Sequence, residues 1–340
     1  MFTNLVNRAV TKFVRIVKKI PSEPPDVYLG KIPVSRTQPV FFVAEIGVNH
    51  NGGMEIAKKL IDIASEAGAQ AVKFQKRTIP MVYSAEELAK PRAVPRDLLE
   101  NAIKREALPK ESVERLIKSD FQDSTDGDLK YAREFNEAEY RELFSYANQK
   151  GLLCFASPWD EESLDFLEKL DPPCHKIASA MLTNAGLLRK VKQTGRPVIL
   201  STGMSTMEQV RKALSILGTR NLILLHTVST YPAEEKDLNL RTIIKFRKFF
   251  PAVQVGYSGH EKGIVASVAA ATIGARLIER HITLDKKMFG GDQAASLEPQ
   301  EFVELVKAVR AMSAATGTGV KTVLEAEIPI IKMLRKTQDF

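Results

Sequence analysis

Residues 197–228, PVILSTGMSTMEQVRKALSILGTRNLILLHTV, contain a complete strand-helix-strand repeat. The repeat begins with the short apolar run PVILSTG, continues through an amphipathic segment of helix length and ends with a second apolar run, LILLHTV. Short, continuous β-branched and leucine-rich runs that alternate with helices are typical of a parallel sheet buried on both faces. This stretch therefore predicts an α/β protein.

The same alternation continues on both sides of this stretch and gives eight apolar runs in total. The other six are FFVAEIG (41–47), AVKFQ (71–75), LLCFASP (152–158), HKIAS (175–179), VQVGYSG (253–259) and RLIERHIT (276–283). Eight strand-helix units in one chain close naturally into a (β/α)8 TIM barrel. In this chain of 340 residues, we expect the barrel to occupy residues 40–315.

Three segments do not belong to the repeating units. Residues 1–39 are predicted to form an amphipathic basic helix over residues 2–20 and then a hairpin, DVYLGKIPVS (26–35), that plugs the end of the barrel opposite its mouth. The helix would either attach to an anionic membrane surface or a partner groove, or pack on the barrel or on a neighbouring subunit. Residues 76–136 are too long for a simple connection and predict an insertion of short helices over the mouth. Residues 316–340 form a C-terminal tail.

Composition narrows the class of protein. The net charge of +8 would suit nucleic acid, a membrane surface or an anionic substrate, but no nucleic-acid-binding motif accompanies it, so we expect no nucleic-acid partner. No stretch approaches the roughly 18 apolar residues of a membrane span, and the N-terminus lacks a signal-peptide pattern, which favours a cytoplasmic protein. Cys154 and Cys174 have no CxxC spacing and are interpreted as reduced, buried thiols. We also expect a homo-oligomer.

Polar side chains are concentrated where the predicted strands end. In a barrel, the C-terminal strand ends form the active-site mouth. Charged groups at the ends of such apolar strands need partners or a ligand, because burial of an unpaired charge is costly. The residues at these ends are Glu45, Lys73, Gln75, Ser157, Lys176, Ser179, Ser201, Thr202, His226, Ser229, Ser258, His260 and His281.

Lys73 and Lys176, together with nearby serine hydroxyls, have the chemistry of a socket for a phosphate and a carboxylate. Two other interpretations stay open. Each lysine could merely neutralise a barrel glutamate, or one of them could form a Schiff base as in aldolases.

Histidines suggest a metal site. His260 follows the seventh strand and His281 lies on the eighth, so their imidazoles should be neighbours and could hold a divalent ion beside Asp285 or Asp292. In the loop NHNGG, we interpret Asn51 as a helix cap. His175 precedes its strand next to a proline-containing turn and is interpreted as structural.

At these residues the sequence resembles the N-acetylneuraminate (sialic acid) synthase family. The matching stretches cover most of residues 40–310 in the family's order and are specific together, although each is weak alone. They are AEIGVNHNG, AVKFQ, FASPWDEESLDFLEKL, HKIASA, RPVILSTGMSTMEQV, LLHTVSTYPA, DLNLR, VGYSGHEKGI, GARLIERHITLDK and AASLEPQEF. The resemblance covers the barrel domain only, and we expect the family's C-terminal antifreeze-like domain to be lacking.

The resemblance implies a transferase that condenses phosphoenolpyruvate with an aldose, such as N-acetylmannosamine or a related sugar, to give a nonulosonic acid and phosphate. It implies a divalent metal, Mn2+ in the first place with Mg2+ or Co2+ as alternatives, held by His260 and His281. Glu45 and Tyr231 would face the sugar, and Asp292 would contact the sugar or a metal-bound water. The residues implied to hold phosphoenolpyruvate are Lys73, Ser157, Lys176, Ser179, Ser201, Ser229 and Ser258. Within this scheme Glu45, Lys73 and Lys176 are the expected catalytic residues.

Departures from the family pattern leave a second hypothesis open. The family usually carries an acidic residue where this chain has Met181, and we expect the Met181 thioether to lie near the reacting carbons, where it cannot relay a proton. Gln293 stands where many relatives have histidine, and Gly259 replaces an aspartate common in bacterial relatives. The alternative is therefore a catalytically impaired barrel that serves as a ligand-binding scaffold or regulatory partner.

Overall fold

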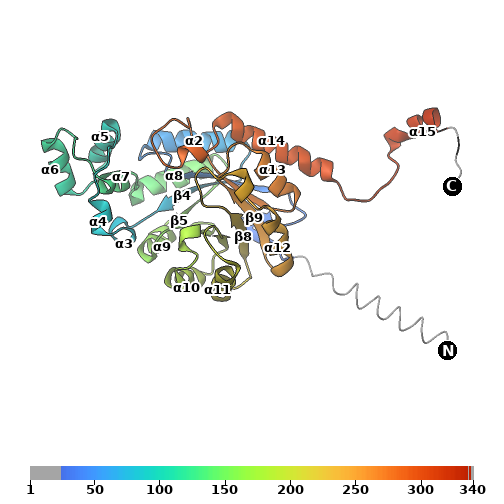
Figure 1. Cartoon of the computed structure of the whole chain (residues 1–340), viewed down its shortest axis with the longest axis horizontal. Helices are drawn as coiled ribbons and strands as arrows, with labels where there is room; N and C mark the ends of the chain where they lie inside the picture. The colour runs from blue at the N-terminus through green and yellow to red at the C-terminus, as the bar shows by residue number, and fades with distance from the viewer. Residues whose placement is uncertain (1–23, 336, 338–340) are drawn as a thin grey trace.

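The computed structural model describes residues 24–335 and 337, so the helix predicted over residues 2–20 lies outside the described part of the chain. The strands of its main sheet are β3 (Phe41–Gly47), β4 (Ala71–Lys76), β5 (Leu153–Pro158), β6 (His175–Ile177), β7 (Val198–Ser201), β8 (Leu222–Thr227), β9 (Gln254–Gly259) and β10 (Leu277–His281). They are parallel and lie in the order β5-β4-β3-β10-β9-β8-β7-β6. Because β5 and β6 also contact each other, the sheet closes almost completely, and the predicted barrel is confirmed (Figure 1).

A helix follows each strand and packs on the outside of the sheet. These helices are α2 (Met54–Glu66), α8 (Glu137–Gln149), α9 (Glu161–Glu168), α10 (Ala185–Gln193), α11 (Met207–Leu217), α12 (Arg241–Phe249), α13 (Val265–Thr272) and α14 (Pro299–Thr316). The start of α11 shows the local reason: the Thr206 hydroxyl accepts from the Gln209 amide, while the Gln209 side chain accepts from the Thr206 amide. This capping box satisfies backbone groups that a helix terminus would otherwise leave unpaired. Short 3-10 turns, η1 (Ser179–Met181), η2 (Glu235–Asp237) and η3 (Gln293–Ala295), precede α10, α12 and α14.

The predicted hairpin is present and closes the N-terminal end of the barrel. Its strands, β1 (Val27–Leu29) and β2 (Ile32–Val34), pair antiparallel. Leu29 and Val34 are fully buried and belong to the same apolar cluster as Phe41 and Leu277, which begin their own strands. The Gln254 side chain donates to the carbonyls of Pro24 and Pro25 at 3.2 and 3.1 Å. The hairpin therefore acts as a plug that keeps water out of the barrel from below.

The long connection after β4 folds into five short helices, as the sequence predicts. They are α3 (Ile79–Val82), α4 (Ala85–Leu88), α5 (Arg96–Lys104), α6 (Lys110–Lys118) and α7 (Asp126–Ala132). These helices bury their own apolar cluster, with Leu99, Leu116 and Leu129 at its centre, and project to one side of the barrel (Figure 1). None of their residues lines the central pocket described below. Arg133, just after α7, donates to Asn51 in the loop that follows β3, and the position of the inserted helices over the mouth stays a prediction.

Two further features bear on the sequence expectations. Cys154 and Cys174 are free, buried thiols, as predicted. Beyond α14, the turn η4 (Glu325–Glu327) and helix α15 (Ile328–Leu334) run away from the barrel (Figure 1). Within residues 24–335, no helix combines the length and the apolar character that a membrane crossing requires.

Alternating side-chain direction along β10 positions part of the site. Ile278 packs in the cluster between sheet and helices, whereas Leu277 belongs to the cluster inside the barrel. Arg280 points to the helix side, where its guanidinium donates to Glu261 Oε1 at 2.9 Å and to the Ser267 hydroxyl at 3.0 Å. Because successive side chains of a strand point to opposite faces, the anchoring of Arg280 outside directs its two neighbours into the barrel.

We expect Arg280→Met to lower the free energy of unfolding by about 3–5 kcal/mol, because it leaves the buried Glu261 carboxylate without its cation. Urea unfolding followed by circular dichroism measures the loss. A second variant, Arg280→Met with Glu261→Gln, should recover part of it, since no uncompensated charge is then buried. Additive losses in the double variant would contradict this account of the pair.

Candidate active site

A pocket of about 180 Å³ opens at the C-terminal ends of the barrel strands. Its wall combines charged, hydroxyl and imidazole side chains from seven of the eight strands or the turns that follow them. The lining residues are Glu45, Lys73, Gln75, Ser157, Trp159, Lys176, Ala178, Ser179, Ala180, Met204, Thr227, Ser229, Tyr231, Ser258, His260, Glu279 and His281. The mouth of the barrel is therefore a polar cavity above an apolar plug.

Two lysines and two glutamates form a buried charge cluster at the bottom of this pocket. Lys73 Nζ lies 2.7 Å from Glu45 Oε2 and 3.7 Å from Glu279 Oε1, and Lys176 Nζ lies 3.0 Å from Glu279 Oε1. All four side chains are at most 5% exposed. Lys73 also donates to the Ser157 hydroxyl at 3.2 Å. Each lysine thus contacts a barrel glutamate, as expected if the lysines neutralise buried carboxylates. Both lysines also line the cavity and remain available to a ligand.

The pKa values show how the cluster shares its charge. Burial alone would raise the pKa of Glu279, but the ammonium groups of Lys176 and Lys73 outweigh it and hold this pKa at about 2. For Glu45, burial raises the pKa above its ordinary value, an effect that Lys73 opposes and Glu279 reinforces. Burial also lowers the pKa of Lys176, against the attraction of Glu279. Glu279 is therefore the fixed anion of the cluster, and Glu45 is the carboxyl group that most readily takes up a proton.

The two histidines predicted to be neighbours do lie side by side, with ring centroids 5.5 Å apart. His260 Nδ1 is 2.6 Å from the Val228 carbonyl and donates to it, which leaves the Nε2 lone pair free. Burial lowers the pKa of His260 to about 3, with the nearby His281 adding to the effect, and burial lowers the pKa of His281 to about 4. His281 Nδ1 is buried and has no hydrogen-bond partner among the described residues. Both imidazoles are neutral at pH 7, as a metal ligand must be.

The predicted serines do not all occupy the same kind of position. Ser258 donates to Glu279 at 3.2 Å, and the Ser179 hydroxyl accepts from the Gly203 amide at 3.0 Å. Ser229 lines the pocket, and its hydroxyl lacks a partner among the described residues. Ser201 is buried with an equally unpartnered hydroxyl but is not part of the pocket wall. The wall therefore offers hydroxyl groups whose hydrogen-bonding capacity is not yet used.

Two residues that the family resemblance placed at the sugar differ in position. Tyr231 lies on the wall, with its ring 4.1 Å from the His260 ring and 44% of the residue exposed. Asp292 occupies the N-cap position of η3 without a side-chain cap and does not line the pocket. Burial raises the pKa of Tyr231, and the charge of Asp292 raises it further. It also opposes the lowering of the His281 pKa.

Met181 is not where the sequence led us to expect it. Its side chain packs against the cluster between the sheet and the helices, and it does not line the pocket. The turn η1 carries Ser179 and Ala180 toward the cavity and then turns Met181 back under the core. The expectation that this thioether lies near reacting groups is therefore wrong.

Three further polar residues, Asn51, His226 and His175, lie outside the pocket wall. Asn51 does not cap α2, whose N-cap residue Gly53 forms no side-chain cap; the Asn51 amide donates to the Phe289 carbonyl and accepts from Arg133. His226, at a strand end, is directed away from the pocket and contacts the Leu238 carbonyl through Nε2 at 2.7 Å. The structural interpretation of His175 is confirmed by its 2.7 Å contact with Glu168.

Sequence reasoning missed Glu279 and Trp159. Glu279 is two residues after the inward-facing Leu277 and two before His281, so the strand period of two would have placed it inside the barrel. Trp159 follows β5 and lines the pocket, while the Arg77 guanidinium lies 4.7 Å over its ring. Its buried Nε1 has no partner among the described residues. Trp159 lies in a loop, and loops have no regular period from which the direction of a side chain could be predicted.

The fold and this pocket define a (β/α)8-barrel enzyme of the sialic acid synthase type. The NeuB family profile matches residues 60–321, and the chain belongs to this family. It is 37% identical over 306 residues to N-acetylneuraminate-9-phosphate synthase of Homo sapiens, which covers 89% of this chain and 79% of that protein. It is 34% identical over 300 residues to N,N'-diacetyllegionaminic acid synthase of Campylobacter jejuni, covering 87% and 83% of the two chains.

A solved structure agrees with this assignment. The N-acetylneuraminic acid synthetase of Leptospira borgpetersenii, crystallised in complex with citrate, superposes with a TM-score of 0.73 at 29% sequence identity. The match covers 92% of this chain and 99% of that one.

The rim residue His50 provides a pH-dependent test of the structure. Its ring stacks on Phe135 with centroids 4.3 Å apart, and Nδ1 accepts from the Gly52 amide at 3.0 Å. Burial, followed by the charges of Arg133 and Arg105, lowers its pKa from 6.5 to about 3. Below pH 6.5 the unfolded chain therefore binds a proton at His50 that the folded protein does not bind.

Stability must then fall as the pH falls from 6.5 toward 3, and the term is absent above 6.5. Between pH 6.5 and 5, we expect the wild-type protein to lose roughly 1–2 kcal/mol more unfolding free energy than His50→Gln, whose side chain does not titrate. Urea titrations at each pH measure the difference. Equal losses in the two proteins would show that His50 is not held neutral by the fold.

Proposed function

We propose that this enzyme condenses phosphoenolpyruvate with an aldose to give a nonulosonic acid and inorganic phosphate. The observation that carries the proposal is the arrangement of two buried lysines and several serine hydroxyls opposite two neutral histidines within one small pocket. The names of the relatives support the product class, because they are synthases of N-acetylneuraminate 9-phosphate and of a legionaminic acid. The proposed aldose is N-acetylmannosamine or a related sugar.

Lys73 and Lys176 would bind the phosphate and carboxylate of phosphoenolpyruvate. They supply positive charge, and the hydroxyls of Ser157, Ser179, Ser229 and Ser258 would fix the orientation of the bound molecule. Glu279, 3.0 Å from Lys176, opposes the fall in the pKa of this lysine that burial causes, and so favours the ammonium form that binds an anion over the neutral amine that a Schiff-base mechanism needs. Ser201 would contribute only if substrate binding brings its hydroxyl to the wall.

Glu45 would balance the charge that the substrate brings. The cluster is neutral with two lysines and two glutamates, so an incoming anion leaves an excess of negative charge. Because burial has already raised the pKa of Glu45, this carboxyl group can take up a proton and relieve the excess. The same property would let Glu45 accept or donate a proton during the reaction, a role typically worth about 10²- to 10⁴-fold in rate.

His260 and His281 would hold a divalent cation, Mn2+ or in its place Mg2+ or Co2+. Their neutral rings, the free Nε2 lone pair of His260 and the unpartnered buried Nδ1 of His281 fit such a group. Among the described residues, no set of three or more His, Cys, Asp or Glu side chains could enclose an ion, so water and substrate would complete the coordination. When bound, the ion would act as a Lewis acid toward the sugar aldehyde.

The chemistry then needs few protein groups. The methylene carbon of phosphoenolpyruvate attacks the aldehyde carbon of the sugar and forms the new carbon-carbon bond. Water adds to the carbon that bears the carboxylate, and phosphate leaves by cleavage of the carbon-oxygen bond. The lysines hold the charges in place throughout, and Tyr231, half-exposed above His260, would face the sugar.

The function is tested by phosphate release from phosphoenolpyruvate with Mn2+ and a panel of aldoses. We expect the wild-type protein to release phosphate with at least one N-acylated hexose. Lys73→Met and Lys176→Met keep much of the apolar stem and remove the charge, so each should lower the rate at least 100-fold and abolish thermal stabilisation by phosphoenolpyruvate. A folded wild-type protein that binds the metal but stays silent over the whole panel would instead support a ligand-binding scaffold.

Metal binding has a matched control within the chain. Calorimetry with Mn2+ should show binding to the wild-type protein and its loss in His260→Ala and in His281→Ala, because each removes one of two protein ligands. His226→Ala removes an equally buried imidazole whose Nε2 already contacts a carbonyl, and it should leave the affinity unchanged. Unchanged affinity in both site variants would place the ion elsewhere.

A further inference from the structure

A second hollow, of about 450 Å³, lies at the other end of the barrel. It is formed by the linker that precedes β3, the C-terminal part of α13 and the C-terminal half of α14, two helices that run side by side (Figure 1). Three arginines, Arg36, Arg276 and Arg310, line it together with hydroxyl side chains. These are Thr37, Thr272, Ser313 and Thr316.

The hollow collects positive charge. None of its described lining residues is Asp or Glu. A fourth guanidinium is close, because Arg247 donates to the carbonyl of Ile273, next to the lining residue Thr272, at 3.1 Å. Burial lowers the pKa of Arg247, and the charges of Arg36 and Arg276 lower it further. Within residues 24–335, Arg36, Arg247 and Arg310 form no ion pair. By contrast, Arg280 and the insertion arginines Arg92, Arg96 and Arg105 each pair with a carboxylate. Like charges held together in this way destabilise the protein unless an anion joins them.

The surroundings also hold the guanidinium group of Arg310 in place. Arg310 donates to the Val40 carbonyl at 2.9 Å, and its guanidinium lies 5.3 Å from the centroid of the Phe42 ring. Guanidinium groups that are fixed by the backbone lose less freedom when they bind a ligand, and their planar forks match the oxygens of a phosphate.

We propose that this hollow is a binding site for a small phosphate-class polyanion, separate from the active-site pocket. Arg36 and Arg310 would bind its oxygens, with Arg276 and Arg247 adding charge, and the hydroxyls of Thr37 and Ser313 would complete the contacts. The seven residues of β3 separate Val40 from the rim, roughly 20 Å at the rise of a strand. A substrate anion held by Lys73 and Lys176 therefore cannot reach this site, and the proposal does not depend on the proposed function.

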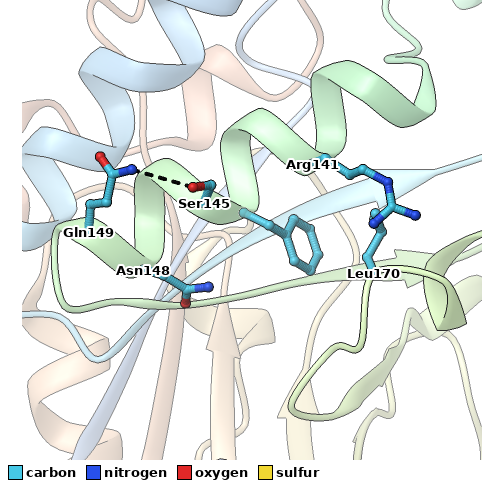
Figure 2. A pocket seen from close by; sticks show the side chains of 6 residues that line it. Arg141, Ser145, Asn148, Gln149 and Leu170 are labelled. Carbon is cyan, nitrogen blue, oxygen red and sulfur yellow. Dashed lines mark hydrogen bonds between the residues drawn. The ribbon is translucent and has the colours of Figure 1, made fainter.

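A control arginine lies in another surface hollow, on α8. Figure 2 shows this hollow with Arg141, Ser145 and Gln149 on its wall. The Arg141 guanidinium donates to Glu137 at 2.7 Å, so its charge is already paired. The two hollows thus contain the same cation in opposite electrostatic settings, and only the first should attract an anion.

The test is calorimetric titration of the full chain with inorganic pyrophosphate at low salt. We expect wild-type binding to weaken at least about tenfold in Arg36→Gln and in Arg310→Gln, because each removes a charge-assisted pair of hydrogen bonds. Arg141→Gln should bind like the wild type. Lys176→Met should keep this binding while it loses stabilisation by phosphoenolpyruvate, which separates the two sites.

Several results would overturn the proposal. Wild-type protein without pyrophosphate binding would do so, as would binding that Lys176→Met abolishes and Arg36→Gln leaves intact, since the anion would then occupy the active site. Equal weakening in Arg141→Gln would indicate nonspecific attraction to a basic surface. Arg310→Gln also removes a contact to Val40. If that variant unfolds, Arg36→Gln decides the outcome, because Arg36 forms no hydrogen bond with the described residues that the substitution would remove. Repeating the titration with a sugar phosphate distinguishes an organic phosphate ligand from inorganic phosphate.

Discussion

The mutual neutralisation of Lys73, Lys176, Glu45 and Glu279 is the interaction on which the site depends. Each charge lies in an interior that excludes water, where a single unpaired ion would cost several kcal/mol. Glu279 accepts from Lys176 and lies within 3.7 Å of Lys73, so it joins strands on opposite sides of the barrel. With this balance the barrel can keep two ammonium groups at the floor of a pocket without a ligand to pair them.

This balance requires an enclosed floor. The hairpin below the barrel buries Leu29 and Val34 against the first residues of the strands, so water has no path to the charges from that side. Within the charge cluster, adjacent strands bring Glu45 opposite both His281 and Lys73 in register. The apolar layer and the polar layer are therefore successive layers of inward-facing side chains on the same strands. Burial of the apolar layer stabilises the barrel and offsets the cost of burying the charges.

The ion cluster and the histidine pair give the pocket two chemically different regions. Lys73 and Lys176 supply positive charge, whereas His260 and His281, which are almost as buried, lie beside the half-exposed Tyr231. Burial keeps both imidazoles neutral, while the lysines remain paired with carboxylates. One pocket thus offers positive charge on one part of its wall and uncharged imidazole nitrogens on another.

The sequence by itself determined the eight strands, their order and the residue types at their ends, because a strand period of two and the alternation with helices are local properties. Lys73, Lys176, His260 and His281 could be placed at the mouth on that basis. Only the tertiary structure decided that Glu279 pairs with both lysines, that Met181 turns back into the core, that Asp292 lies off the wall and that the inserted helices stand to one side. These outcomes depend on barrel closure and on loop geometry, which are set by contacts between residues far apart in the chain. Such contacts produce no periodic pattern in the sequence, so they could not be predicted from it.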